Sequence, residues 1–321
     1  MSAEMPSDSP HLLIAGAAPP LDAGATLPAL PPLPNLDALL RRLRVVQRLA
    51  VDDADEAPAT PHELALARAH GLPGAPGRIA WAAFEHGVVG TPCAWLQPAH
   101  IQLSMDDVQL IDPAALELSE AESQALLAAC APLLAQDGLR LRHVSPGRWL
   151  AEGELLRGLV CTSPARAATR RLSRQALARA DAPAQQRQLA RLQSELEMLL
   201  SAHPVNQARE AARQWPANAL WLHGAGALDA PVPARTGVRV APQLTQGEAA
   251  CHAAAHVAAW QAIDADDAAA LLAALRAGQS VQLTLSGPRR ALTLASGGAG
   301  LWQRVSGFFG RQPLQELRQQ L

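Results

Sequence analysis

Residues 189–226 read LARLQSELEMLLSAHPVNQAREAARQWPANALWLHGAG and organise the second half of the chain. The opening part repeats leucine at the spacing of one helix face: Leu189, Leu192, Leu196 and Leu199. Pro204 suits the first turn of a second helix, where a residue has no intrahelical N–H bond to make. Pro216 marks a boundary before an apolar strand over Ala219–Leu222. Two helices and a strand in close succession predict a mixed α/β fold.

The predicted strand runs through His223 into a glycine loop, Gly224–Gly226. Glycine accepts positive φ, so this loop can direct amide N–H groups toward an anion, or it can simply turn the chain. Asn206 and Arg209 lie three residues apart on one side of the predicted helix and can face the glycines across a crevice. The candidate ligand-binding residues are therefore His203, Asn206, Arg209, Asn218, His223, Gly224 and Gly226.

Three of these polar side chains also have a structural explanation. Asn218 can cap a loop, and His203 can cap the helix that begins at Pro204. Arg209 can bind a carboxylate or phosphate ligand, or it can form an ion pair with a core carboxylate. The chain has no Ser-His-Asp ordering and no G-x-S-x-G elbow, so no catalytic residue is predicted.

The composition excludes several classes of function. With 321 residues, 49% of them hydrophobic, the chain is long enough for two domains. A net charge of −2 argues against a nucleic-acid or anionic-membrane binder, because such proteins usually carry a basic face. The sequence contains no lysine and no tyrosine. A Walker lysine, a Schiff-base lysine and a tyrosine proton donor are therefore impossible.

Cysteine usage and the N-terminus indicate a cytoplasmic protein. The four cysteines show no C-x-x-C spacing: Cys93, Cys130, Cys161 and Cys251. Neither a zinc ribbon nor a disulfide framework is expected, and a reducing compartment fits. The apolar run His11–Gly16 is too short to span a bilayer, so it predicts a first strand and no membrane association.

Local signals predict the remaining elements and the domain order. Thr60 and Glu63 form a capping box that opens a helix over 61–70. His62 in its first turn could take part in chemistry, but a structural role is the favoured alternative. Apolar residues on one side of 36–50 predict a further helix. The expected domains are a disordered tail, an N-terminal α/β domain with hairpins, an Arg-rich linker and a C-terminal α/β domain: 1–10, 11–162, 163–187 and 188–321.

His252 and His256 form a weak candidate for a metal site. Histidines four residues apart share a helix face, and Glu248 lies one turn earlier. The spacing H-A-A-A-H lacks the glutamate of the zincin motif H-E-x-x-H. An Ala-rich exposed helix is the favoured alternative, so no metal and no cofactor are predicted.

Residues 200–241 resemble a segment of the archaeal-type cofactor-independent phosphoglycerate mutases. The resemblance rests on His203-Pro204-Val205-Asn206, Arg209, Pro216-Ala217-Asn218 and Leu222–Gly226. It implies an alkaline-phosphatase-like metalloenzyme with an Asp-Gly metal motif, a serine nucleophile and later Asp/His clusters. Those motifs are not evident here: the one Asp-Gly, Asp137-Gly138, is a helix stop.

Nearly the whole chain is similar to the RpfE-type regulatory proteins. The matching elements are His11-Leu12-Leu13, Leu33-Pro34-Asn35-Leu36, Pro61-His62-Glu63, Trp81-Ala82-Ala83, Thr91-Pro92 and residues 192–226. This resemblance implies a regulatory association and no biochemical activity. Together with the candidate pocket, it predicts a non-catalytic regulatory protein that binds a partner protein or a small anionic metabolite. The alternative is a phosphoglycerate mutase-like phosphoryl-transfer enzyme with an incomplete metal site.

Overall fold

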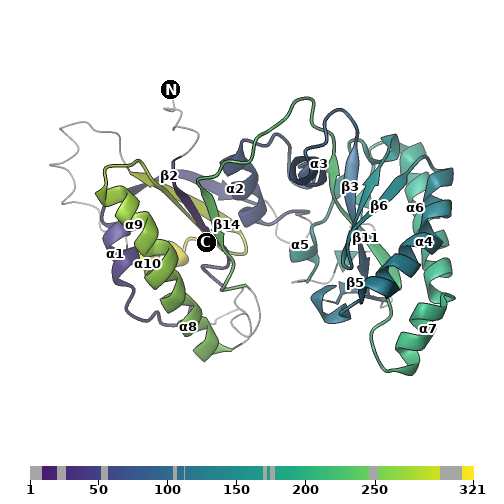
Figure 1. The fold of residues 1–321 in the computed structure, drawn as a ribbon. Coiled ribbons are helices and arrows are strands. Elements are labelled where there is room, and N and C mark those ends of the chain that lie inside the picture. The colour runs from purple at the N-terminus through teal and green to yellow at the C-terminus, as the bar shows by residue number, and fades with distance from the viewer. Residues whose placement is uncertain are drawn as a thin grey trace. The chain divides into compact units, whose positions relative to one another are not determined.

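The computed structural model describes residues 9–19, 27–51, 57–103, 107–111, 113–168, 172–173, 178–245, 252–296 and 313–321. The chain divides into two compact units, both built from helices and strands (Figure 1). Unit 1 takes Met1–Ala54, Thr60–Gly71 and Ala234–Leu321, and unit 2 takes Asp55–Ala59 and Leu72–Pro233. The predicted mixed α/β class is therefore confirmed.

Unit 1 is built on a five-stranded sheet in which the N-terminal strand is an internal strand. Its strand order is β12 (Val238–Ala241), β1 (His11–Ile14), β13 (Gln282–Ser286), β14 (Arg290–Ser296) and β2 (Leu43–Ala50). β1 is parallel to both neighbours, while β14 is antiparallel to β13 and β2. A strand with parallel partners on both sides is buried on both faces. This explains why all four residues of β1 are buried.

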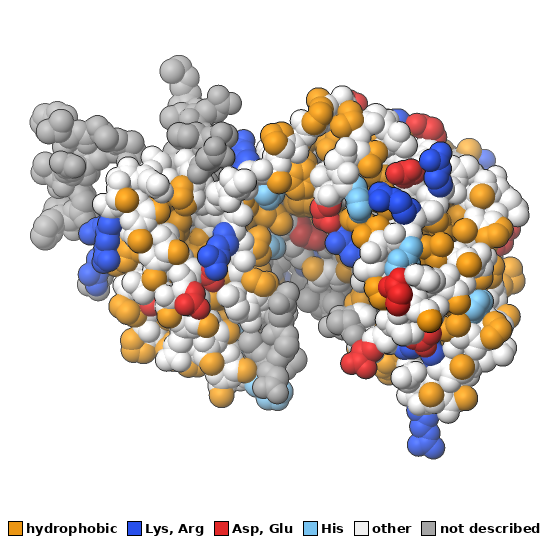
Figure 2. All heavy atoms as spheres, in the orientation of Figure 1, with side chains coloured by type: hydrophobic (Ala, Val, Ile, Leu, Met, Phe, Trp, Pro, Cys, Tyr) orange, Lys and Arg blue, Asp and Glu red, His pale blue; other side chains and the backbone are white. Residues whose placement is uncertain are grey.

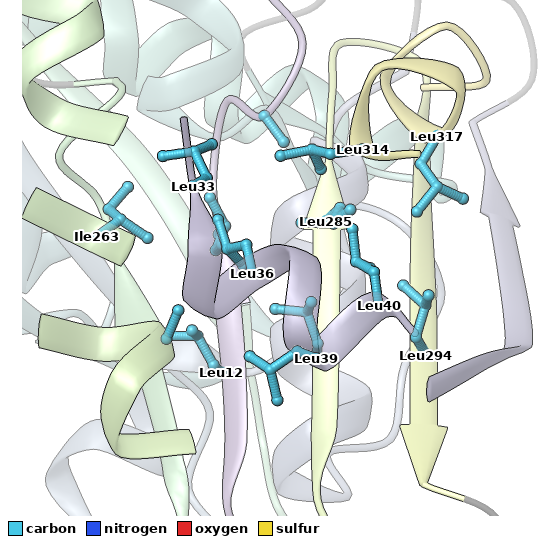
Figure 3. Packing of buried hydrophobic residues seen from close by; sticks show 14 of the residues in the cluster. Leu12, Leu33, Leu36, Leu39, Leu40, Ile263, Leu285, Leu294, Leu314 and Leu317 are labelled. Atoms are coloured by element: carbon cyan, nitrogen blue, oxygen red, sulfur yellow. The ribbon is translucent and has the colours of Figure 1, made fainter. Parts of the chain in front are cut away.

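Helices cover both faces of this sheet. The larger core contains leucines of α1 (Pro34–Leu40) and α10 (Leu314–Arg318) packed against strand residues, as Figure 3 shows for Leu36, Leu317 and Leu285. Ile263 of α8 (Ala253–Ile263) belongs to the same core. A π-helical turn, Asp264–Ala268, joins α8 to α9 (Ala269–Arg276). The other face of the sheet is covered by α2 (Pro61–His70), which contacts β1, β2, β13 and β14.

Unit 2 contains an antiparallel sheet that carries three of the candidate residues, His223, Gly224 and Gly226. Its order is β11 (Ala219–Gly226), β3 (Cys93–Ala99), β7 (Arg148–Glu152) and β6 (Arg140–Ser145). One face packs on α4 (Glu120–Gln136), α6 (Pro183–Ser201) and α7 (Pro204–Ala211) through Leu126, Leu196 and Trp149. The short helix α3 (Trp81–His86) lies against β11 and β3, next to Trp95.

Shorter elements complete unit 2. A hairpin of β4 (Ile101–Leu103) and β5 (Asp107–Leu110) pairs with β9 (Leu172–Ser173). β8 (Val160–Cys161) pairs with β10 (Ala178–Arg179), and α5 spans Pro164–Ala168. Two 3-10 turns cover Pro113–Leu116 and Glu154–Leu156.

The division into units differs from the expected domains. β1 lies between β12 and β13, so the N-terminal strand belongs with the C-terminal part of the chain. The expected linker 163–187 contains α5, β9, β10 and the start of α6, and its described residues belong to unit 2. Arg166 there is 3% exposed and donates from Nε to the Ala57 carbonyl. Residues 1–8 of the expected tail lie outside the described residues.

The helix expected over 36–50 is wrong in its second half. α1 ends at Leu40, and Leu43–Ala50 forms the edge strand β2, paired with β14. The two helices predicted within residues 189–226 are confirmed as α6 and α7. The predicted capping box of Thr60 with Glu63 is also present. Among the described residues, no helix has both the length and the apolar character needed to cross a bilayer.

Candidate functional site

Asn206 is a buried tie between three segments. Its side chain is 1% exposed and donates from Nδ2 to the carbonyls of Leu200 and Ala217, each at 2.8 Å. Its Oδ1 accepts from the Ala217 N–H at 2.9 Å. These bonds join α7 to the last turn of α6 and to the approach to β11. Both donor hydrogens are used, so Asn206 has no N–H for an anion.

Arg209 is likewise engaged within the protein. It is 3% exposed, and its Nη1 lies 2.9 Å from the Glu122 carboxylate. Nε donates to the Trp215 carbonyl at 2.9 Å, and Nη2 donates to the Leu116 carbonyl. Burial raises the pKa of Glu122, but hydrogen bonds from Ser119 and Arg209 outweigh it and hold the pKa below its ordinary value. Arg209 therefore forms the structural ion pair that was the alternative to a ligand contact.

The next two candidates also have local structural roles. His203 is the N-cap of α7, and its Nδ1 accepts from the Val205 N–H at 3.2 Å. Asn218 bonds to both backbone groups of Ile101: Oδ1 accepts from N–H at 2.8 Å and Nδ2 donates to the carbonyl at 2.9 Å. It thereby ties the start of β11 to β4.

The predicted glycine loop is part of β11. Gly224 has φ +62°, and a Cβ there would lie 3.0 Å from Trp81 Cβ. Gly226 has φ +153°, and a Cβ there would lie 2.9 Å from Ala80 Cβ. The glycines therefore allow the start of α3 to approach the strand, and the pairing with β3 is irregular between His223 and Gly226.

The predicted anion pocket is corrected by these contacts. Arg209 and Asn206 bond to Glu122, Leu200 and Ala217, whereas the two glycines pack against Ala80 and Trp81. The side chains that were expected to meet across a crevice are held in different contacts. Of the predicted residues, His223 alone belongs to the cluster described next.

His223 lies beside a group of charged and aromatic residues on the α3 side of the unit 2 sheet. We call this the Trp95 cluster; its members are Glu85, His86, Trp95, Arg142, Arg148 and His223. The Arg148 guanidinium stacks over the Trp95 ring at 3.8 Å and pairs with Glu85 at 2.6 Å. The rings of His86 and Trp95 are 5.0 Å apart, and Arg142 Nη2 lies 3.4 Å from His86 Nδ1. Figure 2 shows acidic, basic and histidine side chains gathered over this part of unit 2.

Two ring nitrogens of the Trp95 cluster are buried without a partner. Trp95 Nε1 and His223 Nε2 have no hydrogen bond among the described residues. Burial, followed by the charge of Arg148, lowers the pKa of His223 to about 3, so the ring stays neutral near pH 7. Burial and Arg142 also lower the pKa of His86. Only His223 was a sequence candidate; the other members come from four separate segments, and no local motif joins them.

Unit 1 contains a second polar group, beneath α2. His11 Nε2 lies 2.8 Å from Thr284 Oγ1, and His62 Nδ1 lies 3.3 Å from Ser286 Oγ. Burial lowers the pKa of His11 and of His62 to about 4. Ser286 is 1% exposed, and its hydroxyl donates a hydrogen bond to the Ile14 carbonyl on the neighbouring strand β1. His62 therefore has the structural role that was its favoured alternative.

The histidines of the weak metal candidate lie at the start of α8, and His252 is exposed. His256 Nε2 accepts from the Trp260 indole at 3.1 Å, and His252 is the N-cap of α8. Within the described ranges, no three His, Cys, Asp or Glu residues are grouped to hold a metal ion. Burial raises the pKa of the Cys93 thiol to about 11 and of Cys130 and Cys161 to about 12. These thiols are therefore poor nucleophiles. Cys251 and Glu248 lie outside the described residues.

No protein-family model matches the chain, and no curated protein sequence matches it. Among solved structures, the chain is similar to the cofactor-independent phosphoglycerate mutase from Thermoplasma acidophilum DSM 1728, with 16% identity and a TM-score of 0.37. That similarity covers 97% of this chain and 99% of the mutase. The chain is also similar to the PH0037 protein from Pyrococcus horikoshii, with 13% identity, a TM-score of 0.45 and coverage of 92% and 89%. The RpfE-type resemblance remains a prediction.

Proposed function

We propose that this protein is a non-catalytic regulatory protein of the RpfE type, and that it binds a partner protein through the Trp95 cluster. The observation that carries this proposal is the stack of Arg148 on Trp95, closed by the ion pair with Glu85. The side chains of Arg148 and Glu85 are 40% and 39% exposed. An arginine held rigidly on a buried tryptophan loses little entropy on binding, and both residue types are enriched at binding hot spots.

The charge arrangement favours a protein partner over a small anionic metabolite. Glu85 already neutralises Arg148 at 2.6 Å, so a small anion would have to displace that carboxylate. The exposed Arg142 and Glu85 offer both signs of charge on one face. A protein surface can match both signs at once, and such complementarity gives specificity.

The alternative phosphoryl-transfer function has little support from the described side chains. A mutase of that type needs an activated nucleophile and an anion-binding arginine. Ser286 is buried and donates to a carbonyl, the described thiols have raised pKa values, and Arg209 is paired with Glu122. The purified protein is therefore expected to give no interconversion of phosphoglycerates when Mn²⁺ is supplied. Robust turnover that a chelator abolishes would replace our proposal with the enzyme reading.

A site-specific photo-crosslinking experiment tests the binding function. A photoreactive amino acid at position 142 should give a discrete protein adduct in cells, and adding Arg148→Ala should remove that adduct. The matched control carries the photoreactive residue at position 187, an exposed arginine on α6 away from the Trp95 cluster. Equal adducts from both positions, or an adduct at 142 that survives Arg148→Ala, would contradict the proposed site.

A further inference from the structure

A groove runs between helix α6 and the outer strand β11 of unit 2. Among the described strands, β11 forms a ladder with β3 only; β8 also lies close to β11, but the edge at Ala219–Leu222 has no strand partner among them. The groove is lined by Ile101, Gln193, Leu196, Glu197 and the four consecutive residues Ala219–Leu222. It continues along Met198, Ser201 and Asn218. Consecutive strand residues can line one groove only if the backbone edge itself forms a wall, because successive side chains point to opposite faces.

The pairing with β3 indicates which backbone groups face the groove. Leu220 of β11 lies opposite Pro98, which has no N–H to donate. The ladder bonds therefore run through the flanking pairs Ala219–Ala99 and Trp221–Gln97, since bonded and non-bonded pairs alternate in an antiparallel ladder. On this assignment the N–H and C=O groups of Leu220 and Leu222 point to the open edge, where they can pair with another strand.

The side chains along the groove are mostly apolar; Gln193, Ser201 and Asn218 are neutral polar members, and Glu197 is the one carboxylate in the lining. Leu196 packs in the core, and the neighbouring Leu220 and Leu222 are partly buried against it. Met198 is 65% exposed, the largest exposed fraction among the large hydrophobic residues described. Glu197 lines both parts of the groove, is exposed, and forms no ion pair with any described residue. The preceding glutamate on this helix, Glu195, is paired with Arg191.

We propose that this α6–β11 groove binds an extended peptide segment of a partner protein. The segment adds to β11 as a further strand of the sheet, buries alternate apolar side chains against the groove, and sets a basic side chain against Glu197. Main-chain hydrogen bonds supply affinity in this mode of recognition, and pockets for alternate side chains supply specificity. The inference uses residues outside the Trp95 cluster, so it stands or falls separately from the proposed function.

Glu197, which has no ion pair among the described residues, also favours a peptide over a second copy of this chain. A two-fold pairing of β11 with itself would bring Glu197 to both sides of the new interface. Like charges at an interface are unfavourable, whereas a basic peptide residue is complementary to this carboxylate. The groove therefore fits a basic, extended partner better than self-association.

Phage-displayed random decapeptides, selected on the full-length protein, provide the probe. Enriched sequences should alternate apolar residues and contain Arg or Lys, and their fluorescein-labelled synthetic forms should bind in fluorescence anisotropy. Glu197→Gln should weaken binding roughly two- to fivefold, as expected for an exposed ion pair, while the matched variant Glu195→Gln should leave it unchanged. Failure to enrich any such sequence would overturn the proposal.

Backbone methylation of the peptide tests strand addition without altering the protein fold. Peptides that are N-methylated at one residue each, along the length of the peptide, should fall into two sets that alternate in sequence. One set should weaken binding about tenfold or more, because each methyl group removes a donor to the edge of β11, and the other set should have little effect. Equal effects in both sets would contradict strand addition. A dimer of the peptide-free protein in analytical ultracentrifugation, dissociated by an excess of the enriched peptide, would show that a second copy occupies the groove.

Discussion

Arg209 and Glu122 form an ion pair of 2.9 Å that joins α7 to the first turn of α4. The two residues are 87 positions apart, and the same Glu122 side chain also completes the capping box with Ser119. One carboxylate therefore stabilises a helix terminus and a tertiary contact at once. Arg209, which the sequence offers as a ligand-binding residue, is therefore engaged in contacts within the fold.

Replacing Arg209 with alanine should lower the free energy of unfolding by roughly 3 kcal/mol. The arginine is 3% exposed, and its loss removes the donors to Glu122 Oε1 and to two backbone carbonyls, while Glu122 Oε2 keeps its bonds from Ser119. Urea denaturation followed by tryptophan fluorescence measures the change. Arg187→Ala, at an exposed position on α6, should shift stability by less than about 0.5 kcal/mol and serves as control. Equal stability of both variants would mean that Arg209 is not a structural tie.

Stability should fall as the pH is lowered from about 6.5 to about 4. The pKa of His11 is lowered to about 4 in the folded protein, by burial first and then by His70 and Arg235. In this window the unfolded chain binds a proton that the folded chain does not, so protonation favours unfolding. His11→Asn should reduce the slope of stability against pH by up to about 1.4 kcal/mol per pH unit. An unchanged slope would show that His11 can take up a proton in the folded state.

Alanine substitutions at Gly224 and Gly138 should separate backbone strain from close packing. Both glycines have similar positive φ values, +62° and +73°. A Cβ at Gly138 would meet nothing within 4 Å, whereas at Gly224 it would lie 3.0 Å from Trp81 Cβ. Gly138→Ala should cost roughly 1 kcal/mol for the left-handed conformation alone, and Gly224→Ala should cost measurably more. Thermal unfolding of the two variants makes the comparison, and equal losses would show that α3 shifts away freely.

Arg213→Gly should stabilise the protein by roughly 0.5–1 kcal/mol. Arg213 follows the C-terminus of α7 with φ +58°, a conformation that costs an L-residue energy and that glycine adopts readily. The N–H groups of Arg213 and Gln214 close the helix onto the carbonyls of Glu210 and Arg209. Arg213→Ala keeps the strain and should give no gain in melting temperature. A gain from alanine as well would assign the effect to the charge of the side chain.

Where the controlling contacts lie within about four residues, the sequence alone determined the structure. The capping box of Thr60 with Glu63 is such a contact, and its helix begins where the box predicts; Ser119 and Glu122 form the same motif at the start of α4. The leucine periodicity of α6 is also local, because it reflects the turn of the helix itself. His203 and Pro204 likewise mark the start of α7 in the sequence and in the structure.

Tertiary structure alone decided the features that depend on distant partners. α1 begins at Pro34, where the N–H groups of Asn35 and Leu36 bond to the Asp264 carboxylate, more than two hundred residues away. The residues after α1 form a strand because β14 offers them a ladder of hydrogen bonds, which outweighs their helical pattern. β1 joins the C-terminal strands for the same reason, since its polar backbone groups are satisfied between β12 and β13. The roles of Arg209 and Trp95 likewise depend on Glu122 and Arg148, partners that no local pattern in the chain identifies.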